Sequence, residues 1–335
     1  MRLSCLAFVA VLVLQAPAPE REPAPQEDPR YRIRVSTELV PVPVTVKDGQ
    51  GRLVPGLEVA DFRIFEDGVE QRISLFTADP FPLSAAILVD TGLHTSDAQK
   101  LTSGLISLSG AFSEFDEMAL YTFDTLVHQT LDFTVESDRL FAALKKLQGE
   151  AGAGTAPSGG PLWEGPRING RSITGMPNIR RGGPAVTKRL DDAIYAAAQD
   201  LKRRDRGRRK IILVLSDGSN SSANQVSTEE ALSFLQQADI SVYAVEAAGV
   251  RLPGKKNTLE RYTIVTGGDY YSSLRRGSIE KLYAHATEQA RNQYTLAYVP
   301  RGGAGAGFHT IEVRVRRPGL TLLTREGYFS AGPTP

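Results

Sequence analysis

Two short apolar segments that each lead to an acidic residue constrain this chain most. Residues 85–89 are Ala-Ala-Ile-Leu-Val and are followed at once by Asp90, and residues 211–215 are Ile-Ile-Leu-Val-Leu and are followed two positions later by Asp217. Apolar runs of this length are typical of strands buried on both faces of a parallel sheet. Because ligands of open α/β sheets bind beyond the carboxyl ends of such strands, we expect Asp90 and Asp217 at one binding edge.

Strand-like and helix-like patterns alternate from about residue 84 to residue 291. The strand patterns cover residues 85–89, 118–123, 211–215 and 240–245, with a short one near 269–271. Between them, apolar residues recur at helical spacing on stripes that begin at Leu101, Leu190, Leu232 and Ile279. This alternation predicts an α/β fold with a doubly wound, mostly parallel sheet.

Both ends of the chain have the short alternating segments of β-structure. At the N-terminal side they are residues 33–35, 42–46, 62–65 and 73–76, and at the C-terminal side 294–299, 309–316 and 320–325. Pro41 and Pro43 favour an edge or irregular strand for the second of these segments, and the glycine-rich residues 301–307 predict a hairpin. Since a few strands cannot bury much surface alone, we expect the two ends to pack as one small β-sandwich.

These patterns divide the chain into five parts. The expected parts are a signal peptide at residues 1–18, a flexible linker at 19–30, an N-terminal β segment at 31–80, the α/β domain at 81–291 and a C-terminal β segment at 292–330. Residues 149–183 are rich in Gly, Pro, Ser and Arg and have no periodicity. A loop of this length inside a domain is usually functional or disordered, and we expect it on the same edge as Asp90 and Asp217.

The N-terminus predicts export. Arg2 precedes an apolar run at residues 3–14 and then small residues, which is the pattern of a secretory signal. An uncleaved anchor is the alternative, and it is the one membrane attachment that the sequence offers. The predicted location is therefore the periplasm, the cell envelope or the extracellular space. The single cysteine, Cys5, lies inside the signal, so the mature chain would hold neither a disulfide nor a thiol nucleophile.

The net charge and the absence of catalytic motifs argue against nucleic-acid binding and against enzyme activity. Lys and Arg total 39 against 38 Asp and Glu, so the net charge does not indicate a nucleic-acid partner. The basic run at residues 202–210 is interpreted as a solvated helix end and turn. The four histidines are scattered, and neither a nucleophile elbow nor a His-Glu-x-x-His motif is present. We identify no catalytic residues and expect no enzyme activity.

Blocks of residues along most of the chain resemble a known family. The sequence between Leu190 and Ile194 (Leu-Asp-Asp-Ala-Ile), Leu-Ser-Asp-Gly from Leu215 and Thr-Gly-Gly from Thr266 resemble the central blocks of von Willebrand factor A domains. The flanks, including Asp-Phe-Arg-Ile-Phe-Glu-Asp-Gly from Asp61 and Gln-Tyr-Thr-Leu-Ala-Tyr-Val-Pro from Gln293, are similar to the bacterial group described as VWFA-related, common in acidobacteria. The resemblance covers about residues 31–330 without the long loop.

The resemblance implies a metal-ion-dependent adhesion site. Such a site uses an Asp-x-Ser-x-Ser motif, a threonine from a later loop and an aspartate after a central strand. Asp90 and Asp217 match the two acids, and Thr187 is the nearest match to the threonine, although the N-cap of the following helix is its alternative role. The serine positions fall on Gly92 and His94, so the site is degenerate. The cation implied is Mg²⁺ or Mn²⁺.

The function indicated is that of an exported protein-binding, adhesion-type or scaffolding module with a protein partner. Its ligand face would be the C-terminal edge of the α/β sheet, and the face residues expected there are Thr91, Gly92, His94, Thr95, Ser96, Gly218 and Ser219. The alternatives are a purely structural periplasmic module with a dead metal site and, third, an uncharacterised enzyme.

Overall fold

The computed structural model describes residues 39–93, 104–152, 167–168, 171–172, 188–246, 257–272, 279–301 and 305–332. Glu38–Pro335 form one compact unit. The predictions for the signal peptide, the linker, His94, Thr95, Ser96 and Thr187 lie outside the described residues, as does most of residues 149–183.

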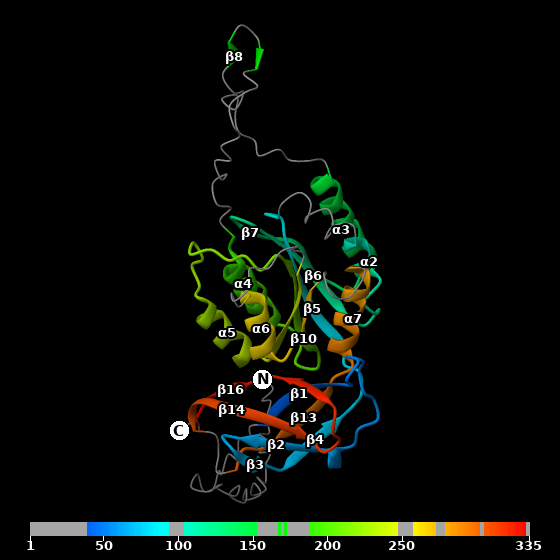
Figure 1. Ribbon diagram of the computed structural model, residues 1–335, viewed down its shortest axis with the longest axis vertical. Coiled ribbons are helices and arrows are strands. Elements are labelled where there is room, and N and C mark those ends of the chain that lie inside the picture. The colour runs from blue at the N-terminus through cyan, green and yellow to red at the C-terminus, as the bar shows by residue number, and fades with distance from the viewer. Residues whose placement is uncertain are drawn as a thin grey trace, which may run out of the picture. The chain divides into compact units, whose positions relative to one another are not determined.

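The described part of the α/β region contains a six-stranded sheet in the order β12-β11-β10-β5-β6-β7 (Figure 1). Its strands are β5 (Leu83–Asp90), β6 (Glu117–Phe123), β7 (Val127–Thr134), β10 (Arg209–Ser216), β11 (Ile240–Glu246) and β12 (Tyr270–Ser272). Each neighbouring pair is parallel except β6 and β7, which are antiparallel. The prediction of a mostly parallel sheet is confirmed, and the one antiparallel strand lies at the edge.

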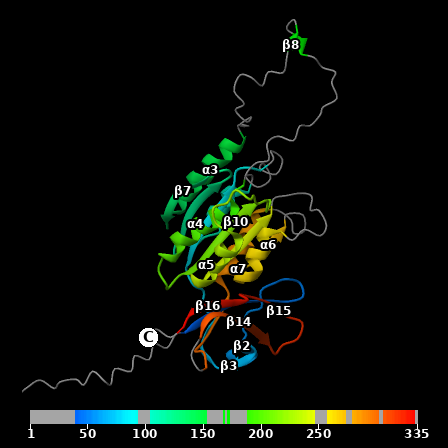
Figure 2. The ribbon, with the colours of Figure 1, turned by 90° about the vertical axis from the view of Figure 1, so that its left-hand side faces the viewer.

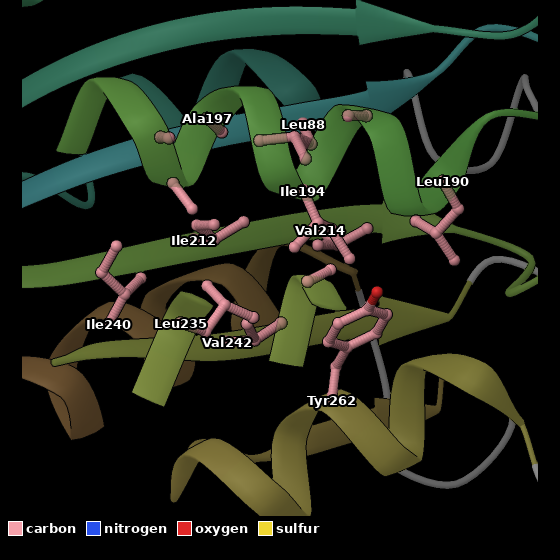
Figure 3. Packing of buried hydrophobic residues seen from close by; sticks show 14 of the residues in the cluster. Leu88, Leu190, Ile194, Ala197, Ile212, Val214, Leu235, Ile240, Val242 and Tyr262 are labelled. Atoms are coloured by element: carbon pink, nitrogen blue, oxygen red, sulfur yellow. The ribbon is translucent and has the colours of Figure 1, made fainter. Parts of the chain in front are cut away.

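Alternating side chains of the central strands pack into two hydrophobic cores, one on each face of the sheet. Ile87 and Leu213 belong to the core under helices α2 (Leu105–Ser109), α3 (Ser137–Gly152) and α7 (Ile279–Arg291). Leu88 and Val214 belong to the opposite core, under α4 (Leu190–Lys202), α5 (Thr228–Gln237) and α6 (Thr258–Thr266). Figure 2 looks onto the second helical layer, and Figure 3 shows its core.

The burial of β5 and β10 explains their uniformly apolar sequences. Ile87 and Val214 are completely buried, and burying a side chain of this size stabilises the fold by about 1.5–3 kcal/mol. Helix α4 covers these strands with small and branched residues. Ile194 and Ala197 belong to the same cluster as Leu88 and Val214, and Figure 3 shows Ile194 next to Val214. Strands with helices on both sides need apolar residues at every position, which is the pattern that the sequence shows.

Strands from the two ends of the chain intermix in two further sheets. The N-terminal strands are β1 (Val40–Lys47), β2 (Phe62–Glu66), β3 (Val69–Gln71) and β4 (Ile73–Thr77), preceded at β2 by a 3-10 turn η2 (Val59–Asp61). The C-terminal strands are β13 (Tyr294–Tyr298), β14 (Ala306–Val315), β15 (Thr321–Thr324) and β16 (Gly327–Ala331). The sheet orders are β15-β1-β13-β4 and β16-β14-β2-β3, and side chains of both sheets share one hydrophobic cluster.

Two sequence interpretations of these end segments are wrong in detail. β1 is not simply an edge strand, because its C-terminal half pairs with β15 and its N-terminal half with β13. Pro41 and Pro43 lie in the half of β1 that pairs with β13 alone. Proline has no backbone N–H to donate, and in this half of β1 no donor is needed on the side without a neighbouring strand. Residues 301–307 do not close a hairpin, because β13 and β14 belong to different sheets.

Some elements were not predicted. β7 alternates half-buried and exposed residues and contains several polar ones, so its sequence lacks the apolar run of the central strands. α3 extends to Gly152, into the stretch expected to be loop, and α6 carries only a weak apolar stripe. The short strands β8 (Arg167–Ile168) and β9 (Arg171–Ser172) pair with each other. The Ser227 side chain is the N-cap of α5 and accepts from the Glu230 amide.

Candidate functional site

The candidate site lies where the chain leaves the two central strands in opposite directions. From β5 the chain continues to β6, on one side in the sheet, and from β10 to β11, on the other. Loops that diverge in this way leave a crevice at the carboxyl ends of the strands, which is where α/β sheets bind ligands. Asp90 is the last residue of β5, and Asp217 directly follows β10. The sheet topology therefore brings the two predicted acids to one edge.

A lysine that the sequence interpretation missed joins the two acids. The Lys188 Nζ lies 2.8 Å from Asp90 Oδ2 and 2.7 Å from Asp217 Oδ2. The Lys188 side chain is 6% exposed, and those of Asp90 and Asp217 are 0% and 17% exposed. Buried charges are found where they are paired and hydrogen-bonded, and this ammonium has two carboxylate partners.

Further hydrogen bonds use the remaining carboxylate oxygens. Asp90 Oδ2 also accepts from the Ser216 hydroxyl at 2.6 Å, and Asp90 Oδ1 accepts from the Gly92 amide at 2.9 Å. Asp217 Oδ1 accepts from the Ser219 amide at 2.8 Å. Each of the four oxygens therefore has at least one donor within the protein.

The two aspartates differ in their pKa because they differ in burial. Burial raises the pKa of Asp90, although Lys188 and Ser216 both favour its ionised form. Burial also opposes ionisation of Asp217, but hydrogen bonds from the Lys188 ammonium and the Ser219 amide outweigh it, so the pKa of Asp217 is lowered.

The first turn of α4 holds the loop after β10 in place. Asp191 is buried and accepts hydrogen bonds from Asn220, Thr228 and Tyr262 at 2.7–2.8 Å. The neighbouring Asp192 accepts from two successive loop amides, those of Gln225 and Val226. Acidic side chains are favourable at a helix N-terminus, and here they also fix the loop that follows Asp217. These two acids were noted in the sequence only as part of the family resemblance.

The predicted face residues that the structure describes form the rim of this edge. Thr91 and Ser219 are exposed, and Gly92 and Gly218 are partly exposed. A cleft of about 720 Å³ lies next to the rim and is lined by Thr228, Asn257, Thr258, Glu260, Arg261, Ile264, Val265 and Glu326. Asn257 links the cleft to the rim, because its side chain caps α6 and lies against Gly218.

The described residues of this edge do not fit the divalent ion that the family resemblance implies. Mg²⁺ takes six oxygen ligands at about 2.0–2.1 Å. An ion this close to Oδ2 of both Asp90 and Asp217 would coincide with the Lys188 ammonium. Gly92, at the first serine position, supplies no side-chain oxygen. Thr187 lies outside the described residues, but its alternative role does not hold, since the N-cap residue of α4 is Arg189.

One sequence signal could have revealed Lys188. It stands two residues before the first residue of α4, where the helix dipole disfavours a cation. A lysine at such a position indicates that nearby anions compensate for it. Ser216 gave no comparable signal, because a serine at the end of a strand is common in turns.

A second group of potential ligands lies on the sheets formed by the chain ends. Among the described residues, ligand atoms of Glu66, Asp67 and His309 lie within 4.8 Å of one another. The His309 Nε2 lies 2.9 Å from the Gly305 carbonyl oxygen, and its Nδ1 lies 2.8 Å from Asp67 Oδ2. Both neighbours can only accept, so both ring nitrogens carry protons in this arrangement. The hydrogen bonds to Gly305 and Asp67 raise the pKa of His309.

Comparisons with known proteins add likenesses of fold. No family model and no curated protein matches the chain. A solved structure of BatB from Bacteroides thetaiotaomicron aligns with 62% of this chain and 98% of its own, at 13% identity and a TM-score of 0.40. Manganese-loaded TRAP from Plasmodium vivax aligns over 79% and 98%, at 11% identity and a TM-score of 0.39.

Proximal thread matrix protein 1 from the mussel byssus, solved with a zinc-occupied MIDAS motif, aligns with 67% of this chain and 49% of its own. Its identity is 14% and its TM-score 0.43. Likenesses at this level carry no ion, partner or activity over to this chain.

The strand order of the central sheet, its antiparallel edge strand and its two helical layers fit a von Willebrand A-like α/β fold. The fold of this part of the chain is therefore the one that the sequence resemblance implies. Within the described residues, the structure has no helix that is both long and apolar enough to cross a membrane.

Proposed function

We propose that this protein is an exported protein-binding or scaffolding module that recognises its partner at the C-terminal edge of the α/β sheet. The observation that carries the proposal is the edge itself. The buried Asp90 and the partly buried Asp217, joined by Lys188, support an exposed polar rim at the switch point between β5 and β10. A switch point is the usual ligand position in a sheet of this topology, and the cleft beside Asn257 enlarges the surface available to a partner.

We infer that the module has no catalytic role. Among the described residues of the rim, the Ser216 hydroxyl is buried and donates to Asp90, whose carboxylate is already paired with the Lys188 ammonium, so this hydroxyl serves the ion pair and is not exposed to a substrate. The polar groups at this edge satisfy one another, which suits a preformed surface more than a reacting one. The face residues proposed for recognition are Thr91, Gly92, Gly218 and Ser219, together with His94, Thr95 and Ser96.

We also propose the organisation of the whole chain. The two sheets that combine the chain ends act as one small β-sandwich, consistent with their shared hydrophobic cluster, and residues 81–291 form the von Willebrand A-like domain. The signal-like pattern at residues 1–18 supports export to the periplasm, the envelope or the exterior. The blocks quoted from both flanks support membership of the VWFA-related group.

The proposal is tested by blocking the rim. Replacing Thr91 and Ser219 together by arginine places two long cationic side chains on the exposed rim, and no buried residue is substituted. Proteins captured from the native envelope by the wild-type chain should be lost with this variant. The measurement is quantitative mass spectrometry of cross-linked captures.

A matched control keeps the test specific. Asp205→Arg also adds an exposed cation, in the turn between α4 and β10, at the opposite edge of the sheet. This variant should retain the partners. Retention of the same partners by the rim variant, or their loss with the control as well, would refute recognition at this edge. A chain that captures nothing specific in either form would favour the structural-module alternative.

A further inference from the structure

The Lys188 ammonium contacts both acids of the candidate site through their Oδ2 atoms. It lies 2.8 Å from Asp90 Oδ2 and 2.7 Å from Asp217 Oδ2, and the lysine is 4% exposed. A divalent ion that bridged the same two oxygens would need this position. The lysine and the ion are therefore mutually exclusive.

The hydrogen-bond donors around the ammonium supply the remaining charge compensation that a divalent ion would provide. Two carboxylates at one sheet edge repel each other unless a cation lies between them. Lys188 supplies one positive charge, and the Ser216 hydroxyl and the amides of Gly92 and Ser219 donate to the same carboxylates. The ammonium and these dipoles together compensate the two negative charges without a metal.

The main chain at Lys188 is fixed as well. Its carbonyl oxygen accepts from the Ser221 amide at 3.0 Å, and the next amide, of Arg189, donates to the Asp124 carbonyl oxygen at 2.9 Å. These bonds attach the segment before α4 to the loops that follow β6 and β10. The ammonium therefore cannot leave the carboxylates by a free swing of the backbone.

We propose that Lys188 is a built-in cation that holds Asp90 and Asp217 in place of a divalent metal, so that the edge assembles, and binds its partner, without metal ions. The first part of this inference concerns the site alone. The second part, binding without metal, rests on the proposed function.

The site is tested through thermal unfolding of the full chain in EDTA and in 2 mM Mn²⁺, used as the probe ion. The wild-type melting temperature should differ by less than about 1 °C between the two conditions, because no Mn²⁺ enters. Lys188→Met should melt at least about 5 °C lower than the wild type in EDTA, because it leaves the buried carboxylate of Asp90 and the partly buried one of Asp217 without their counter-charge. Adding Mn²⁺, or Asp217→Asn in the same chain, should recover part of this loss.

Lys210→Met is the matched control. Lys210 is also buried, but its ammonium lies near the Lys202 carbonyl oxygen at the other end of β10. Its melting temperature should be unaffected by Mn²⁺, and Asp217→Asn should not stabilise it.

Two outcomes would overturn the inference. One is a rise in the wild-type melting temperature with Mn²⁺ that Asp217→Ala abolishes, because the metal would then occupy the site despite the lysine. This arm needs only the wild type and a single substitution, so it decides the question even where Lys188→Met does not fold. The other is a Lys188→Met chain that neither Mn²⁺ nor Asp217→Asn stabilises.

The capture experiment separates this inference from the proposed function. Partners retained by the wild-type chain in EDTA support binding without metal. Partners that are lost in EDTA, while the melting temperature is unchanged, contradict binding without metal and leave the role of Lys188 standing. Captures that survive the rim variant contradict the proposed function and say nothing against the lysine.

Discussion

Gly218 follows Asp217 with a backbone φ of +74°. Residues with a side chain rarely adopt this conformation. A Cβ atom at this position would also lie 2.1 Å from the Asn257 Oδ1. The Asn257 side chain is itself held by its hydrogen bonds to the Leu259 amide and to Glu246. The turn that carries Asp217 into the site therefore depends on glycine for both its conformation and its space.

We predict that Gly218→Ala lowers the free energy of unfolding by about 3 kcal/mol or more, through strain and collision together. Gly68→Ala separates the two causes, because Gly68 has φ +80° but nothing within 4 Å of a Cβ. This control should lose only about 1–2 kcal/mol. Urea unfolding of both variants measures the difference, and equal losses would show that Asn257 does not constrain the turn.

At the scale of elements, β2, β3 and β14 meet around the Asp67-Gly68 turn. Asp67 Oδ1 accepts from the amide and the hydroxyl of Thr310, and Asp67 Oδ2 pairs with His309. The turn has a local sequence signal, since Asp-Gly favours such hairpin turns. The partner strand was not recognisable, because β14 lies more than two hundred residues along the chain.

The His309 contact predicts a pH dependence of stability. Its pKa is raised in the folded protein above the value of about 6.5 in an unfolded chain, so the folded state binds the proton more tightly. This stabilisation is fully present below about pH 6.5 and is lost as the pH rises through the raised pKa. We expect His309→Gln to cost up to about 1 kcal/mol at pH 5.5 and less at pH 8.5.

The measurement is the urea midpoint of the wild type and His309→Gln between pH 5.5 and 8.5. His128→Gln, on the exposed side of the edge strand β7, is the control for a histidine substitution as such. A difference between the wild type and His309→Gln that grows with pH would contradict the assigned contacts.

At the scale of the whole molecule, the two ends of the chain depend on each other. β1 lies between β15 and β13, and β2 lies between β14 and β3. An N-terminal strand is thus interior in each sheet. Polar contacts also run from these sheets to the α/β part: Arg209 donates to Thr295 Oγ1 at 2.9 Å, and Arg325 to Asp239 at 3.1 Å.

We predict that a chain shortened to residues 78–335 does not reach the native state, because β13 and β14 lose their central partners and the cluster shared by the two sheets is exposed. A chain shortened to residues 39–335 keeps every described strand and should unfold like the full chain. Near-ultraviolet circular dichroism and urea unfolding test both. Native-like cooperative unfolding of the shorter chain would show that the C-terminal strands do not need β1 and β2.

The local sequence was sufficient to predict the strands that are buried on both faces of the sheet. Residues 85–89 and 211–215 were identifiable as buried strands because a strand covered on both faces has no polar position. Asp90 and Asp217 could be assigned to one edge because parallel strands end on the same side of a sheet. The polar edge strand β7 and helix α6, whose apolar stripe is weak, were not predicted from the sequence. Their burial depends on the elements packed against them and not on their own residue pattern.

Only the tertiary structure decided what lies between the two acids. Lys188 precedes a helix and follows a long segment without pattern, and its sequence neighbours do not show where its ammonium points. The choice between a metal and a lysine depends on the position of one buried charge relative to two others that are distant in the chain. Sequence fixes which charges exist, whereas electrostatic compensation depends on distance and burial, which folding alone sets.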